Sequence, residues 1–370
     1  MIFNAGYTGL KWPVILWCLA SFVLFLGGLF IHFPLNTLQG FCLHLYLTET
    51  SRYAWIASLV LMVLPLWRNL RGGALWFLVP FSSSVLLSLP LIWSGAVHHT
   101  FKLDHPFSFG DWIFARQHES GFLPYHHPDA PQRISLVYLP DTKVEAAPIV
   151  FLFHGGGFIQ GSPAQMHSWG VALSKAGCVV VAAAYPLGKD AQFPNPENAA
   201  AALIKSMKGF LYEKGGDTNN IFAGGSSAGA TLALSMAVQH PQLKLSGIIA
   251  AYPLTDFINN PNPLLHLEDI KAAYAGNVKP LNLSLANRMK SSMPPLLLLH
   301  GAKDQIVPVS QSRKLNTFYK GANAYVELPF SNHNFEYPLY GPSGQLLHHL
   351  SIAFIRNPST LMGNIHQAHK

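Results

Sequence analysis

The most informative residues of this chain are a serine and the glycines on either side of it. Residues 225–229 read Gly-Ser-Ser-Ala-Gly, after a segment typical of a strand and before one typical of a helix. Glycines two residues from Ser227 on each side suit a sharp turn in which larger side chains would collide with the backbone. Such a turn exposes the Ser227 hydroxyl at the positive end of the following helix. We expect Ser227 to be a nucleophile, the alternative being an ordinary Gly/Ser turn.

A glycine-rich loop lies upstream, at residues 154–158, with the sequence His-Gly-Gly-Gly-Phe. It follows the apolar run 147–153, which is typical of a strand buried on both faces. Successive glycines leave backbone N–H groups uncovered and able to point at one spot, as the developing oxyanion of acyl transfer requires. The alternatives are a flexible loop and a phosphate cradle. Phosphate binding is disfavoured, because neither Gly-Lys-Ser/Thr nor a complete G-x-G-x-x-G follows.

A candidate base and a candidate acid occur further along the chain. Asp304 follows the apolar segment 293–301, and His333 follows the last strand-like segment. The order Ser227, Asp304, His333 is the chain order of α/β-hydrolase triads. In such a triad His333 removes the serine proton, while Asp304 holds the imidazole tautomer and stabilises its cation. Asp256 is the alternative acid, although a structural role in its loop suits it better.

At these residues the chain resembles the hormone-sensitive-lipase-like branch of the α/β-hydrolases, which includes small-lid bacterial esterases. The resemblance is carried by residues 154–158, 225–229 and 300–304 together with His333. It does not extend to residues 1–100.

The resemblance implies a role for each matching residue. Ser227 would be the nucleophile, Asp304 the acid and His333 the base. The oxyanion hole would be formed by the backbone N–H groups of Gly156, Gly157 and Ala228. The chain departs from this branch at Ser226, where Asp is usual, and at residues 185–190, where Tyr-Arg-Leu-Ala-Pro-Glu is usual. Neither departure removes a catalytic group, but the one at residues 185–190 leaves the subfamily, and with it the substrate, unspecified.

From residue 101 onward the pattern alternates between strands and helices. This alternation predicts an α/β fold, a mostly parallel sheet covered on both faces, and with the motifs it predicts an α/β-hydrolase fold. Residues 261–288 interrupt the alternation only briefly, so we expect a small lid. We expect residues 101–132 to be loop-like, residues 197–214 to be one helix and the tail from Asn357 to be disordered. The expected domains are a transmembrane helical region, 1–100, and a catalytic domain, 101–370.

The composition indicates contact with a membrane. The chain is 50% hydrophobic and only 11% charged, against about 25% charged in ordinary soluble domains. Residues 12–33 and 72–97 contain no Asp, Glu, Lys or Arg, and each run is long enough to cross a bilayer. Residues 53–67 form a shorter apolar run. We expect about three transmembrane helices, the alternatives being a re-entrant hairpin for 53–67 and a cleavable signal peptide for the first run.

The basic residues near these runs predict the orientation. With three spans, Lys11, Arg68 and Arg71 lie on one side, and Arg52 and Lys102 lie on the other. The positive-inside tendency then places the catalytic domain on the non-cytoplasmic side, so we expect a multi-pass membrane protein with that topology. Loss of the middle span reverses the result.

Other classes of function fit the sequence less well. The eighteen histidines include three adjacent pairs, at residues 98–99, 126–127 and 348–349, but no H-E-x-x-H, so we expect neither a metal site nor a cofactor. The net charge of +7 comes without a long Lys/Arg cluster, which disfavours a nucleic-acid partner. Three cysteines, of which only Cys178 lies in the predicted catalytic domain, do not distinguish an oxidising from a reducing compartment. No oligomeric state is predicted.

Two classes of function therefore stay open. The first is a membrane-anchored serine carboxylic-ester hydrolase, esterase- or lipase-like, that acts on a small-molecule or lipid-like ester through an acyl-enzyme. An acyltransferase with the same triad is a variant of this chemistry. The second class is a non-catalytic binding or scaffold module with the same fold. We favour the enzyme, because a scaffold has no need of both the glycine loop and the ordered triad.

Overall fold

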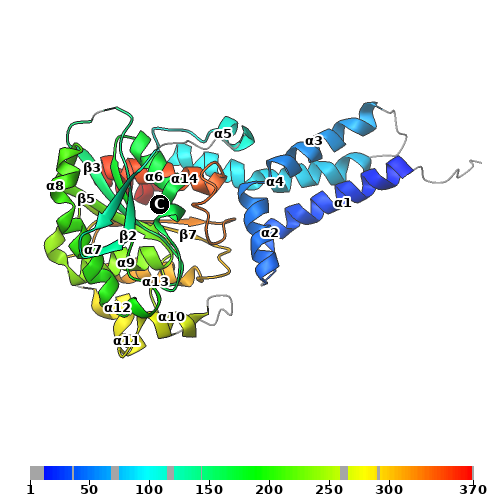
Figure 1. Cartoon of the computed structure of the whole chain (residues 1–370). Coiled ribbons are helices and arrows are strands. Elements are labelled where there is room, and N and C mark those ends of the chain that lie inside the picture. The colour runs from blue at the N-terminus through cyan, green and yellow to red at the C-terminus, as the bar shows by residue number, and fades with distance from the viewer. Residues whose placement is uncertain are drawn as a thin grey trace, which may run out of the picture. The chain divides into compact units, whose positions relative to one another are not determined.

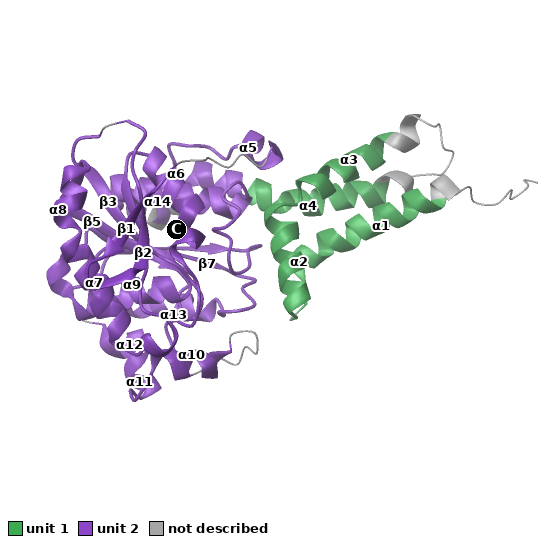
Figure 2. Ribbon diagram, in the orientation of Figure 1, with its two compact units in different colours: residues 1–93 green, residues 94–370 purple. Residues whose placement is uncertain are grey.

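The computed structural model describes residues 12–35, 37–67, 75–114, 121–142, 144–258, 266–289 and 292–368. The chain divides into two compact units, residues 1–93 and residues 94–370, shown in different colours in Figure 2. The division falls inside the helix α4 (Leu75–Thr100), a few residues before the boundary expected from the sequence.

Unit 1 is helical in the part of the chain that the structure describes (Figure 1). It contains α1 (Trp12–His32), α2 (Leu38–Glu49), α3 (Arg52–Trp67) and most of α4, which continues through Pro80 and Pro90. Helix α2 was not predicted. It begins after Thr37, whose hydroxyl accepts a hydrogen bond from the Gly40 N–H at 3.0 Å and so satisfies one of the unpaired N–H groups of the first turn.

Two helices of the described chain, α1 and α4, are long and apolar enough to cross a membrane. The qualifying segments are Ile15–His32 and Leu78–Thr100. Helix α3 has 16 residues, which at about 1.5 Å per residue is shorter than the ~30 Å hydrocarbon layer. Along α1, large apolar side chains such as Phe22 and Val23 are more than half exposed, as expected of a helix surface that faces hydrocarbon.

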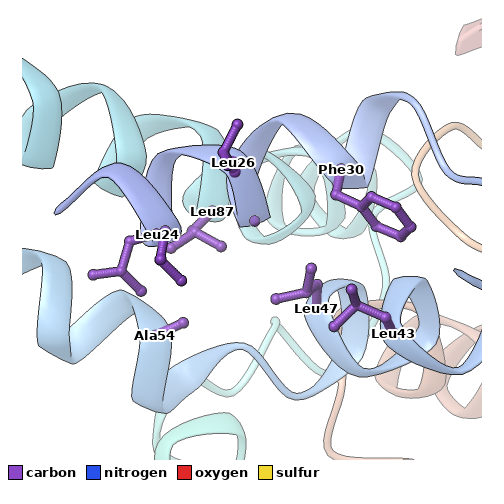
Figure 3. Close-up of a pocket in the computed structure, with 9 residues that line it drawn as sticks. Leu24, Leu26, Phe30, Leu43, Leu47, Ala54 and Leu87 are labelled. Atoms are coloured by element: carbon purple, nitrogen blue, oxygen red, sulfur yellow. The ribbon is translucent and has the colours of Figure 1, made fainter. Parts of the chain in front are cut away.

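An apolar pocket of about 330 Å³ lies among the helices of unit 1 (Figure 3). Its lining consists of Val23, Leu24, Leu26, Gly27, Phe30, Leu43, Leu47, Ala54 and Leu87. None of these side chains can form a hydrogen bond or transfer a proton. The pocket can therefore hold hydrocarbon, but it carries no group that performs chemistry.

Unit 2 is built on an eight-stranded sheet with the order β1-β2-β4-β3-β5-β6-β7-β8. The strands are β1 (Leu123–His127), β2 (Ala130–Tyr138), β3 (Ala147–Phe153), β4 (Val179–Ala183), β5 (Gly216–Ser226), β6 (Gly247–Ala251), β7 (Leu296–Gly301) and β8 (Asn323–Leu328). Strands β1 and β2 pair antiparallel, β2 also runs antiparallel to β4, and the strands from β4 to β8 in the order are parallel. The prediction of a mostly parallel sheet is confirmed.

Helices cover both faces of this sheet, with α6 and α14 on one side and α9 and α13 on the other (Figure 1). The helices of unit 2 are α5 (Phe109–Phe114), α6 (His167–Lys175), α7 (Asn195–Ser206), α8 (Lys208–Glu213), α9 (Ala228–Gln239), α10 (Leu267–Tyr274), α11 (Pro280–Leu283), α12 (Leu285–Arg288), α13 (Ser310–Phe318), α14 (Pro342–Arg356) and α15 (Pro358–Ala368). This two-sided cover explains why β3, β4 and β7 are continuous apolar runs, since a strand buried on both faces has no solvent-facing position.

The parallel strands also position the candidate residues. Ser227, Asp304 and His333 come after the carboxyl ends of β5, β7 and β8, respectively. Because parallel strands end at the same edge of a sheet, residues far apart in the sequence gather there.

Three local expectations were wrong. Residues 101–132 contain α5, β1 and the start of β2 instead of only loops, and residues 197–214 form two helices with a break at Met207. The tail after Asn357 forms the helix α15, in which Leu361, Met362 and Ile365 are buried. About three turns of helix with Leu361, Met362 and Ile365 among mostly polar residues give too weak a periodicity to predict, and the burial that stabilises α15 comes from the rest of unit 2.

Candidate active site

The turn that presents Ser227 joins β5 to α9 directly. Strand β5 ends at Ser226 and α9 begins at Ala228, so Ser227 is the single connecting residue, with a φ of 52° and a ψ of −120°. Few non-glycine residues adopt a positive φ, and this one costs about 1–3 kcal/mol of strain. A Cβ at Gly225 or Gly229 would lie 2.2 or 2.0 Å from the Phe153 carbonyl oxygen. Both glycines are therefore required for the turn to pack against the end of β3.

Asp304 and His333 form a direct pair. His333 Nδ1 lies 2.7 Å from Asp304 Oδ2, and because a carboxylate only accepts, the imidazole donates through Nδ1. The other carboxylate oxygen, Oδ1, accepts the N–H groups of Ile306 and Val307, both at 2.8 Å. His300 Nε2 lies 3.2 Å from Oδ2. The Asp304 side chain is fully buried, so these four contacts hold it in one orientation.

The environment keeps Asp304 ionised. Burial by itself raises the pKa of the Asp304 carboxyl, but the charge of His333 and the hydrogen bonds from His300 and His333 outweigh it and hold the pKa below its ordinary value. With Nδ1 committed to this carboxylate, the Nε2 atom of His333 is the one left to exchange a proton with a neighbouring hydroxyl.

A pocket of about 520 Å³ brings the candidate residues together. Its lining comprises Gly155, Gly156, Gly157, Ile159, Gln160, Gln165, Ser227, His266, Asp269, Ile270, Ile306, His333, Asn334 and Tyr337. Gly156 and Gly157 have φ values of 111° and 65°, and a Cβ at Gly156 would lie 1.9 Å from the Gln160 carbonyl oxygen. These glycines thus face the same space as the serine and the imidazole. Ala228 follows Ser227 at the first position of α9, where backbone N–H groups have no partner within the helix.

The residues that flank the glycine loop are structural. His154 Nδ1 donates to the Gly155 carbonyl oxygen at 2.7 Å, and the ring stacks on Tyr185 with centroids 4.5 Å apart. Burial lowers the pKa of His154 to about 4, so the ring is neutral near pH 7. At the other end of the loop, the buried Phe158 ring stacks on Tyr274, 4.0 Å away. The glycines are held between two fixed aromatic contacts.

Asp256, the alternative acid, lies in a different environment. Its Oδ2 atom is 2.9 Å from Lys314 Nζ, and its Oδ1 atom accepts the Ile258 N–H at 2.9 Å. The second contact is a short loop turn of the Asx type. The structure thus pairs His333 with Asp304, and Asp256 with Lys314.

Metal ligation and thiol chemistry are the remaining alternatives to test among the described residues. There, no group of three or more His, Cys, Asp or Glu side chains is placed to hold a metal ion. Cys178 is buried, and burial raises the pKa of its thiol to about 12, so it stays a neutral apolar residue.

Two residues next to the candidate triad were missed by the sequence analysis. Tyr252 follows β6, and its ring centroid lies 4.2 Å from that of His333. Its hydroxyl donates a hydrogen bond to Glu336 Oε2, three residues after His333. No motif marks either residue, because their proximity comes only from the pairing of strand ends in the sheet.

Taken together, a mostly parallel eight-stranded sheet with a strand–Ser–helix turn at its carboxyl edge is the α/β-hydrolase fold. Comparison with known proteins supports this class, since residues 150–306 match the family model described as alpha/beta hydrolase fold.

The chain is similar to several ester hydrolases. The probable carboxylic ester hydrolase LipM of Mycobacterium tuberculosis is 26% identical over 249 residues, covering 60% of this chain and 58% of LipM. Esterase LipC of the same organism is 23% identical over 233 residues, covering 56% of this chain and 58% of LipC. This chain therefore spans less than two thirds of the length of either relative.

A solved structure shares the fold. The esterase of Pyrobaculum calidifontis superimposes with a TM-score of 0.54 at 20% sequence identity, covering 73% of this chain and 92% of that enzyme.

Proposed function

We propose that unit 2 is a serine hydrolase that cleaves carboxylic esters through an acyl-enzyme intermediate on Ser227. The observation that carries the proposal is the 2.7 Å hydrogen bond between His333 and a buried, ionised Asp304, beside a pocket that Ser227 shares with the glycine loop. The names of the relatives LipM and LipC support an ester substrate.

In the proposed reaction His333 Nε2 takes the Ser227 proton as the serine oxygen attacks the ester carbonyl carbon. The negative charge that develops on the carbonyl oxygen is stabilised by the N–H groups of Gly156, Gly157 and Ala228, each such donor contributing about 3–4 kcal/mol in comparable sites. His333 then returns the proton to the leaving alcohol, and a water molecule, activated in the same way, hydrolyses the acyl-serine. Asp304 stabilises the imidazolium in both halves.

The pocket suits a small-molecule or lipid-like ester. Its lining combines aliphatic side chains, Ile159, Ile270 and Ile306, with polar ones such as Gln160 and Asn334. Mixed linings of this kind bury an apolar portion of a ligand while a few polar groups orient it.

We further propose that unit 1 anchors the enzyme in a membrane through α1 and α4, with the shorter α3 as a third span around which the bilayer thins locally. The two long apolar helices support the anchor. With three spans, the hydrolase unit and the residues before α1 lie on opposite sides of the membrane. The distribution of Lys and Arg predicts that the hydrolase unit is on the non-cytoplasmic side.

A fluorophosphonate probe, which reacts with activated serines, tests the nucleophile directly. We expect the full-length protein in detergent to be labelled, and Ser227→Ala to lose the label. A Ser235→Ala variant, whose hydroxyl is buried and bonded to Glu197, is the matched control and should keep it. An unlabelled wild type would leave the scaffold alternative, and equal labelling of Ser227→Ala would show that another residue reacts.

A series of p-nitrophenyl esters with increasing acyl length then defines the substrate. We expect release of p-nitrophenol with free acid as the second product. Transfer of the acyl group to an added alcohol, with little free acid, would instead identify an acyltransferase.

A further inference from the structure

Glu336 is a buried acidic residue that the proposed reaction does not use. It lies in the loop between β8 and α14, three residues after His333, and only 2% of it is exposed. Its Oε1 atom is shielded from solvent and has no hydrogen-bond partner among the described residues. A buried carboxyl with an unsatisfied oxygen is costly, so its retention beside a candidate active site calls for a physical reason.

Its contacts join the two reacting side chains. The Tyr252 hydroxyl donates to Glu336 Oε2, and the Tyr252 ring lies against the His333 ring, 4.2 Å between centroids at 48°. The Ser226 hydroxyl also interacts with the carboxyl, and Ser226 directly precedes the nucleophile. Glu336 is thus linked to His333 through Tyr252, and to Ser227 through the preceding residue, Ser226. It is not part of the pocket lining.

The groups that contact Glu336 come from the ends of two neighbouring strands, β5 and β6. Ser226 is the last residue of β5, and Tyr252 follows β6, with its ring centroid 6.3 Å from that of His300 in β7. On its own loop lie His333 and Tyr337, and the charge of Glu336 helps to raise the pKa of Tyr337. Burial raises the pKa of Glu336 to about 7, with the Ser226 hydroxyl acting in the opposite direction.

We propose that Glu336 is a positioning residue for the hydrolase reaction, whose carboxylate holds Tyr252 against the face of His333 and stabilises the imidazolium that forms when Ser227 attacks. This inference rests on the proposed function. Asp304 acts on the imidazole through Nδ1, whereas Glu336 acts on it through the tyrosine ring. Glu336 does not line the pocket, so it acts on the reaction only through its neighbours.

The consequence is a second ionisation in the activity. When Glu336 is protonated it carries no charge, and its contribution to the imidazolium is lost. The active form is the carboxylate, so its contribution is present above about pH 7 and disappears as the pH falls through that value. The acid limb of kcat/KM should therefore contain the ionisation of Glu336 in addition to that of the general base.

The test measures kcat, KM and the pH profile of kcat/KM for p-nitrophenyl acetate with the full chain in detergent. Glu336→Gln keeps the size of the side chain and an acceptor for Tyr252, but it cannot become charged. We expect kcat to fall about tenfold at high pH with KM unchanged, equivalent to ~1.4 kcal/mol. The acid limb of kcat/KM should change from two ionisations to one. The exposed Glu213→Gln in α8 is the control and should behave as wild type.

Tyr252→Phe removes the hydroxyl while keeping the ring on His333. We expect it to lower kcat like Glu336→Gln, and the double variant to be no worse than either single one, because Glu336→Gln removes the charge and Tyr252→Phe removes the hydroxyl through which that charge acts. If Glu336→Gln does not fold, the pH profile of Tyr252→Phe tests the proposal by itself. Without the Tyr252 hydroxyl, the acid limb of kcat/KM for this variant should also lose the second ionisation.

The outcomes separate this inference from the proposed function. If fluorophosphonate does not label wild type, the proposed function fails and the role of Glu336 fails with it. If wild type is labelled but Glu336→Gln keeps the wild-type kcat and acid limb, only the role of Glu336 is overturned. A variant with a lower Tm and lower kcat but an unchanged acid limb would reduce Glu336 to a structural residue, which also overturns the proposal.

Discussion

Replacing Asp304 by Asn tests how the candidate triad works. The Asp304 carboxylate accepts His333 Nδ1 at 2.7 Å and the N–H groups of Ile306 and Val307 at 2.8 Å. An asparagine in this position has one oxygen to accept with. If that oxygen keeps the two backbone N–H groups, the amide NH₂ faces His333 and donates to it.

The size of the expected loss of kcat depends on which tautomer of His333 the asparagine favours. An NH₂ group facing Nδ1 favours the imidazole with its proton on Nε2, which cannot accept the Ser227 proton, and the negative charge that stabilises the imidazolium is also lost. In the comparable triad of a serine protease the same change lowers kcat about 10⁴-fold. Such a loss corresponds to ~5.5 kcal/mol of transition-state stabilisation. We expect Asp304→Asn to lower kcat for p-nitrophenyl acetate by about this factor.

Asp256→Asn is the matched comparison. It removes a contact with Lys314, whose side chain is 54% exposed, and such pairs contribute about 0–1 kcal/mol to stability. We expect its kcat within about twofold of wild type. Both variants should be checked for an unchanged far-UV spectrum. A larger loss in Asp256→Asn than in Asp304→Asn would refute the assignment, as would an Asp304→Asn protein with near-normal kcat.

Further predictions concern packing, pH and topology. Gly229→Ala places a methyl group 2.0 Å from the Phe153 carbonyl oxygen, so we expect loss of folded protein. In the control Gly209→Ala, in α8, the new methyl group meets no atom within 4 Å. Denaturant unfolding should show that this control is as stable as wild type or more stable by up to ~1 kcal/mol. Folding lowers the pKa of Asp304, so the ionised carboxylate stabilises the folded protein above the unfolded pKa of about 3.9. This stabilisation is lost as the pH falls below that value. The Tm of Asp304→Asn should therefore fall less steeply on acidification than the Tm of wild type. Ile365→Ala in α15 should lower the free energy of unfolding by about 2–5 kcal/mol, and the exposed Ser359→Ala should not; equal stability would mean that α15 does not pack. A reporter fused after Lys370 should be active on the non-cytoplasmic side, and cytoplasmic activity would reject the three-span topology.

Secondary structure and the serine turn could be predicted from the sequence where the local residue pattern matches the burial of the segment in the folded protein. The run 147–153 is apolar throughout because both faces of β3 are covered, and the same holds for β7. Glycines 225 and 229 could be interpreted from spacing alone, since only a turn packed against backbone excludes a Cβ at both positions.

Prediction failed where the stabilising partner is distant in sequence. Helix α15 depends on burying Ile365 against unit 2, and nothing within its own eleven residues indicates that contact. Glu336 and Tyr252 are 84 residues apart and meet only because β6 and β8 flank β7 in one sheet. Ser226 stood out as a departure from the resembled branch, but its interaction with Glu336 could not be inferred without the register of these strands.

The structure also shows that the serine turn and the glycine loop depend on each other. A Cβ at either Gly225 or Gly229 would clash with the Phe153 carbonyl oxygen. Phe153 is the last residue of β3, and the glycine loop begins at the next residue, His154. One close backbone packing therefore sets the position of Ser227 and the starting point of the proposed oxyanion donors. Any substitution that moves this strand end shifts both at once. A displacement of about 1 Å can cost about 10²-fold in rate, so the two glycine positions 225 and 229 act as one geometric unit and their substitutions should be far from additive.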